Sequence, residues 1–209
     1  MKRTCISRIS FLLILLLVFT TSGCISTGYI KVPEGQKNYI LKGFSLSPPL
    51  GGEWYVQLFG ESSISFTKKL KQPSPHTYAA VIWPQDFDQI CYVKNRDDFF
   101  ECIKKNFEIE QKQSTRFEFT KSDCIQDKRF GEFSVKCHSI AKDYKPAKLP
   151  SEVNYLIMDN YDYFIKHPTL NKYFRITYSE RSIPAEENKS IKEDAQHFFD
   201  SIQLITQEN

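Results

Sequence analysis

The chain has 209 residues, with 28 Lys and Arg against 25 Asp and Glu. Three of the basic residues and none of the acidic ones lie in residues 1–23, so a chain that loses this segment keeps 25 charges of each sign and is formally neutral. A neutral domain lacks the strongly basic face that nucleic-acid binding requires, so the composition supports no nucleic-acid partner and no electrostatic role against anionic lipid.

The first 23 residues have the order of a secretory signal peptide. Lys2, Arg3 and Arg8 form a basic start, and an unbroken apolar run follows over residues 11–19. This run is far shorter than the roughly 20 residues that a helix needs to span a bilayer core. We therefore predict a segment, residues 1–23, that directs export and is then removed.

The tetrapeptide Thr21-Ser22-Gly23-Cys24 resembles the lipobox of bacterial lipoproteins, although that family usually has Leu where Thr21 stands. The resemblance implies that Cys24 becomes a lipid-bearing N-terminus whose acyl chains hold the protein on a membrane. Ile25 replaces the Asp of the enterobacterial retention signal, which favours the outer over the inner membrane. The alternative is an ordinary secreted protein that keeps Cys24 as a free thiol.

Four further cysteines, an even number in an exported chain, predict two disulfides; they are Cys91, Cys102, Cys124 and Cys137. Three connectivities are possible, and we favour the sequential pairs because each joins neighbouring elements. Each such loop would stabilise the fold by roughly 3 kcal/mol in the chain-entropy model. A metal site or a redox pair is the competing interpretation, but no Cys-x-x-Cys occurs. We expect no metal and no cofactor.

The mature chain divides into a tether over 24–47, with one short strand at 38–41, and a single globular domain over 48–209. Alternating apolar residues predict strands at 54–58 and 64–66. Residues 77–83 are apolar on both faces, which is typical of a central strand covered on both sides.

A helix is predicted after Asn95, which serves as its cap, with Phe100, Ile103 and Phe107 on the buried face. Two strands follow at 117–119 and 133–137, the second with Cys137 on its core side and His138 on the other.

The last third of the chain predicts strands at 153–158 and 161–165, separated by a bulge or turn at Asp159 and Asn160. A loop at 167–172 follows because proline stops a strand, and then a strand at 174–178. The final helix begins after Pro184, with an apolar stripe of Ile191, Ala195, Phe198 and Ile202. These elements predict an α+β domain with a mainly antiparallel sheet of about six or seven strands and two helices.

Several short strings resemble small, uncharacterised bacterial lipoproteins; they are residues 44–49 with Gly52 and Trp54, residues 66–69, His76, His167 with Pro168, and residues 178–181. This resemblance implies no known activity. The closing helix after an antiparallel sheet is similar in outline to PsbP-like and Mog1-like α/β sandwiches, a likeness of fold alone.

The leading hypothesis is a non-catalytic binding or assembly module that meets an unknown envelope protein or ligand. No Gly-x-Ser-x-Gly or His-Glu-x-x-His occurs, so no catalytic residue is assigned. The candidate binding residues are His76, His167, Tyr178 and Arg181. A deep pocket gathering the histidines and Arg181 would favour a hydrolase-like envelope enzyme. An exposed aromatic face on residues 161–178 would favour the binding module, and an internal apolar cavity would favour a carrier of a small apolar ligand.

Overall fold

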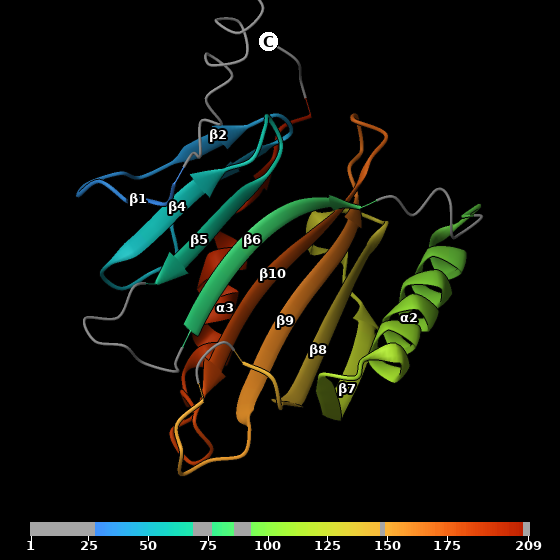
Figure 1. Cartoon of the computed structure of the whole chain (residues 1–209). Helices are drawn as coiled ribbons and strands as arrows, with labels where there is room; N and C mark the ends of the chain where they lie inside the picture. Colours follow the sequence, from blue (N-terminus) through green and yellow to red (C-terminus); the bar gives the residue numbers. More distant parts are fainter. Residues whose placement is uncertain (1–27, 69–76, 86–92, 147–148, 207–209) are drawn as a thin grey trace, which may run out of the picture.

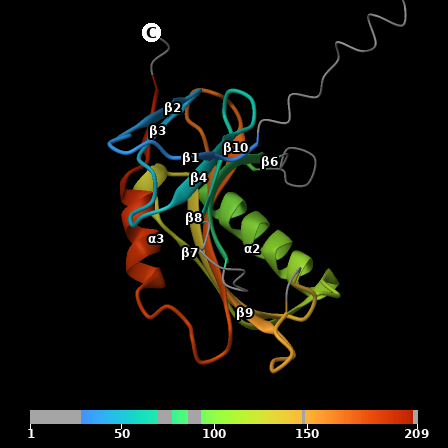
Figure 2. The ribbon, with the colours of Figure 1, turned by 60° about the vertical axis from the view of Figure 1, so that its left-hand side comes forward.

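A computed structural model describes residues 28–68, 77–85, 93–146 and 149–206, which form one α+β domain. A large, curved antiparallel sheet has one α-helix on each face, and a small second sheet lies at one end (Figures 1 and 2). The predicted fold class is therefore confirmed. Among the described residues, no helix is long and apolar enough to cross a membrane.

The large sheet has eight strands in the order β1-β4-β5-β6-β10-β9-β8-β7. Their bounds are β1 Ile30–Lys31, β4 Trp54–Leu58, β5 Ile64–Lys68, β6 Thr77–Gln85, β7 Phe117–Gln126, β8 Ser134–Asp143, β9 Leu156–Lys166 and β10 Tyr173–Ser182. The small sheet has the order β11-β3-β2, with β2 Tyr39–Leu41, β3 Phe44–Leu46 and β11 Gln203–Leu204. The expected central strand is β6, which has three strands on one side and four on the other.

The segment expected as a tether is part of the fold from Ile30 onward. β1 pairs with β4 at the edge of the large sheet, while β2 and β3 pair with each other. Leu41, Phe44 and Leu46 are buried in the main core. The globular domain therefore begins well before residue 48, and strands of two or three residues are too short to show a periodicity in the sequence.

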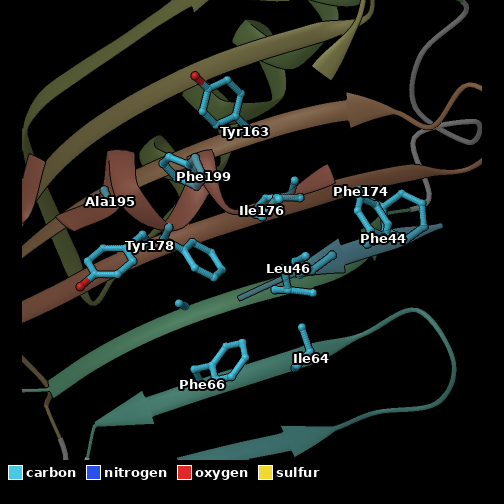
Figure 3. Packing of buried hydrophobic residues seen from close by; sticks show 14 of the residues in the cluster. Phe44, Leu46, Ile64, Phe66, Tyr163, Phe174, Ile176, Tyr178, Ala195 and Phe199 are labelled. Carbon is cyan, nitrogen blue, oxygen red and sulfur yellow. The ribbon is translucent and has the colours of Figure 1, made fainter. Parts of the chain in front are cut away.

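The main core lies between the large sheet, the small sheet and helix α3 (Ile191–Asp200). Figure 3 shows Phe66 of β5, Ile176 of β10 and Phe199 of α3 pointing into this layer. The predicted apolar stripe of α3 is confirmed, because Ile191, Ala195 and Phe198 are buried, as is Ile202 just beyond the helix.

Helix α2 (Arg96–Gln113) covers the opposite face of the sheet over the β7 end (Figure 2). Its predicted cap is confirmed, since the Asn95 side chain accepts a hydrogen bond of 2.9 Å from the Asp98 amide. Its buried residues are Phe99, Ile103 and Phe107. The sequence placed Phe100 instead of Phe99 on this face; Phe99 stacks on Tyr173 and is the residue that enters the core.

The predicted break at Asp159 and Asn160 is wrong. β9 is one strand from Leu156 to Lys166, and its register against β8 and β10 runs without a shift through both positions. Polar residues can occupy a central strand here because each has partners, which satisfies their buried polar groups.

A disulfide joins Cys124 of β7 to Cys137 of β8, two residues that stand directly opposite each other. This is one of the two predicted pairs. Cys102 is also disulfide-bonded. Cys91 lies outside the described residues, so its pairing stays a prediction.

Candidate functional site

His167 is a buried structural residue. Its Nε2 lies 2.8 Å from the Gly43 carbonyl oxygen, and its Nδ1 accepts from the Leu170 amide at 3.2 Å. An acceptor role for Nδ1 makes Nε2 the donor, so His167 ties the β9–β10 turn to the start of β3. Gly43 suits this close approach, because its φ is +91° and a Cβ there would lie 2.9 Å from the histidine Nε2.

The tyrosines of β9 and β10 do not form an exposed aromatic face. Tyr161, Tyr163, Tyr173 and Tyr178 are all buried. Tyr178 packs against Trp54 and Phe198 in the main core. These tyrosines therefore do not supply the exposed aromatic face expected on residues 161–178, and a binding role for Tyr178 stays a prediction.

Arg181 lies on the face of β10 opposite to Tyr178, because the two residues are three positions apart on one strand. Its Nε is 3.3 Å from Oδ2 of the buried Asp143, which also holds Arg116 through two bonds of 2.7 Å. Burial alone would raise the pKa of Asp143, but the hydrogen bonds and charges of these arginines outweigh it and lower the pKa. This cluster links β7, β8 and β10.

The structure does not bring His167, Tyr178 and Arg181 together, and His76 lies outside the described residues. A hollow of about 660 Å³ borders His167, but its lining includes Arg129, Glu132 and Lys166. That mixed lining does not match the apolar cavity expected of a carrier.

A different site, which we call the acidic pocket, opens on the α3 face of the sheet. It is a hollow of about 270 Å³, and its lining residues are Ile140, Ile157, Asp159, Glu180, Ser182, Glu187, Asn188 and Ile191. Asp159 of β9 stands directly opposite Glu180 of β10, so the two carboxyl groups lie side by side on adjacent strands. Glu187 faces them from the connection that precedes α3.

A histidine orients one of these carboxylates. Asp159 Oδ1 lies 2.8 Å from His138 Nε2, and the imidazole stacks on Tyr161 with a centroid distance of 4.2 Å and an interplanar angle of 8°. His138 and Tyr161 are cross-strand neighbours on β8 and β9. The stacked ring fixes the direction of the Asp159 carboxylate, as a second layer of contacts does in binding sites.

Two tyrosines, Tyr78 and Tyr161, lie beside the carboxyl groups of the acidic pocket. Burial raises the pKa of Tyr78 to about 12, with further contributions from the charge of Glu180 and a hydrogen bond to it. Burial also raises the pKa of Tyr161 to about 12, with smaller contributions from the charges of Asp159 and Glu193.

Two lysines of the large sheet, one on β8 and one on β5, are engaged with groups outside the acidic pocket. Lys142 donates to Glu118 at 2.6 Å, and Lys68 lies over the Tyr78 and Trp54 rings. Within the described part of the chain, no group of three His, Cys, Asp or Glu residues is arranged to hold a metal ion. The geometry of the acidic pocket suits a small ligand that donates hydrogen bonds and carries positive charge.

The sequence alone does not show that Asp159 and Glu180 belong to one site. Glu180 is the sequence neighbour of the candidate Arg181, yet the two side chains lie on opposite faces of β10. Asp159 was assigned to a turn. The register of β9 against β10 is the signal that pairs them, and it depends on knowing that β9 is continuous.

No family model matches the chain, and neither does any curated protein. Among solved structures, the chain is similar to LpqN, involved in cell envelope biogenesis of Mycobacterium tuberculosis, with a TM-score of 0.46, 10% identity, and coverage of 85% of this chain and 90% of LpqN. It is also similar to the Ran-binding protein Mog1p of Saccharomyces cerevisiae, with a TM-score of 0.37, 8% identity, and coverage of 86% of this chain and 96% of Mog1p. Likenesses at these TM-scores assign neither an activity nor a ligand.

Proposed function

We propose that this chain is a lipid-anchored lipoprotein of the bacterial envelope that acts as a non-catalytic binding module and takes its ligand in the acidic pocket. The anchor rests on the signal segment and on Cys24. The binding role rests on one observation, the pair of adjacent carboxylates Asp159 and Glu180 facing Glu187 across a hollow. The loop histidine on which the enzyme alternative depended, His167, has its ring nitrogens bonded to backbone groups.

The anchor predicts a mass. Protein purified from membranes should begin at residue 24 and carry the added mass of a diacylglycerol and acyl chains. These chains would hold the protein on the membrane, because each buried methylene adds about 0.8 kcal/mol of membrane affinity. Intact mass spectrometry measures it. A Cys24→Ala variant is the control and should lack the adduct. An unmodified, soluble wild-type protein would contradict the proposal.

The ligand of the acidic pocket should be a small organic cation. Two adjacent carboxylates in a half-enclosed hollow repel each other, and a positive group between them relieves that repulsion. A water molecule occupies about 30 Å³ in the liquid, so a hollow of about 270 Å³ holds a small organic molecule and not only a bare ion. Ser182 adds a hydroxyl group at its wall, and Asn188, also in the lining, is held by Asp194 and Ser190.

The affinity of the acidic pocket should depend on the charge of the ligand. In calorimetric titrations we expect putrescine to bind at least about tenfold more tightly than 1,4-butanediol or succinate, which share its four-carbon chain but are neutral and anionic. Glu180→Gln should weaken putrescine binding at least about tenfold, because it removes a charged partner from the pocket.

Glu108→Gln is the matched control, since it removes one exposed carboxylate from α2, far from the pocket. Because Glu180 is buried, circular dichroism must first show that the Glu180→Gln variant is folded. Asp159→Asn is a second variant, which removes the other carboxylate of the pair from a less buried position. Equal binding of the three four-carbon compounds, or folded pocket variants that bind putrescine like the wild type, would rule out this ligand class.

A further inference from the structure

Four aliphatic side chains are exposed around the β1 edge of the molecule. They are Ile30, Ile40, Leu50 and Leu58, with exposed fractions of 68%, 78%, 62% and 48%. We call this surface the apolar edge. Each residue lies on or beside β1, β2 or β4, which Figures 1 and 2 both show together at one end of the domain.

Backbone contacts hold the parts of the apolar edge together. The connections β1–β2 and β3–β4 line one shared hollow, and Leu50 belongs to it. Val32 donates from its amide to the Trp54 carbonyl at 2.9 Å, and Lys42 donates to the Glu61 carbonyl at 2.7 Å. The second bond fastens the end of β2 to the turn that follows Leu58. The four side chains are therefore displayed by connected segments at the end of the sheet.

The proposed lipid anchor at Cys24 lies close to the apolar edge in the sequence. Only six residue steps separate Cys24 from Ile30, and a fully extended chain covers at most about 3.6 Å per step, so Ile30 lies within roughly 20 Å of the lipidated residue. A domain of this size is about 40 Å across. If Cys24 is lipidated, a chain this short holds the β1 end near the bilayer surface.

We propose that the apolar edge rests in the interfacial layer of the membrane that holds the lipid anchor. This inference depends on the proposed lipidation of Cys24. The charged residues between positions 28 and 61 balance in sign, with Lys31, Lys37 and Lys42 against Glu34, Glu53 and Glu61. Contact therefore depends on apolar side chains entering the boundary between headgroups and acyl chains, and it needs no anionic lipid.

The test uses the full lipoprotein reconstituted into phosphatidylcholine vesicles. Ile40→Cys and Leu50→Cys each carry an environment-sensitive NBD label, and Glu108→Cys on α2 carries the same label as the control. All three positions are exposed, so substitution there should leave the fold intact. Doxyl-labelled lipid should quench the labels at 40 and 50 at least about twofold more strongly than the label at 108, because only the edge reaches the interface.

Flotation of the vesicles separates the two proposals. Protein that floats with the vesicles and is quenched at 40 and 50 supports the inference. Protein that floats but is quenched equally weakly at all three positions overturns the inference and leaves the lipid anchor standing. Protein that does not float contradicts the anchor itself and removes the basis of the inference with it. Vesicles containing phosphatidylglycerol should give the same quenching pattern, and dependence on anionic lipid would overturn the apolar mode of contact.

Discussion

Asp162→Ala should destabilise the domain by about 3–5 kcal/mol, because it leaves a largely buried cation without its main partner. Asp162 is fully buried on β9 and holds Arg175 through bonds of 2.8 and 3.0 Å. Its carboxylate also accepts hydrogen bonds from Thr177 and Asn160. Burial alone would lower the pKa of Arg175, but the charge and hydrogen bonds of Asp162 raise it, so the guanidinium stays charged.

Urea unfolding curves measure this loss. Glu110→Gln is the matched control, because Glu110 contacts the same arginine at 3.4 Å from an exposed position and its removal should cost less than about 1 kcal/mol. Adding Arg175→Met to Asp162→Ala should recover part of the loss, since no uncompensated charge then remains. An Asp162→Ala variant as stable as the Glu110→Gln variant would show that the Asp162–Arg175 pair does not stabilise the domain by this amount.

Phe44→Ala should cost about 3–5 kcal/mol of unfolding free energy, the usual range for emptying a buried phenylalanine site. Phe44 of β3 is fully buried, and its ring centroid lies 4.7 Å from that of Phe174 and 5.3 Å from that of His167. The truncation leaves a cavity where the small sheet meets β10 (Figure 3).

Ile40→Ala, in the adjacent strand, is the control for Phe44→Ala. Its side chain is exposed, so the change should stay within about 0.5 kcal/mol. Thermal or urea unfolding distinguishes the two variants. A Phe44→Ala variant as stable as the Ile40→Ala variant would mean that residues up to 47 contribute little to the fold and serve as a tether after all.

Long periodic elements could be predicted from the sequence, whereas short or fully covered ones could not. The Asn95 cap is a signal within four residues, and the apolar stripe of α3 repeats over several helical turns. β1, β3 and β11 have two or three residues each and contain no complete pattern. β9 carries consecutive buried residues from Asn160 to Ile165, so alternation disappears there, whereas β10 alternates between buried and partly exposed residues from Phe174 onward.

The roles of the site residues also could not be predicted, because they depend on contacts with distant parts of the chain. The role of His167 depends on Gly43, which lies 124 residues earlier in the chain. The acidic pocket depends on Asp159 meeting Glu180, a pairing that follows only from the strand register. Residue types could nominate candidates, but the partners that decide whether a side chain is structural or available come from distant segments.

The pairing of β11 with β3 also constrains the order in which the chain folds. Gln203 pairs with Ser45, and the Ser47 amide donates to Ser201 Oγ across 154 residues of sequence. Contacts so distant in sequence form slowly, because a long loop must close before they stabilise anything. The small sheet is therefore complete only when β11, near the end of the described residues, has joined β3, and a chain truncated before Gln203 would leave β3 with an unpaired edge.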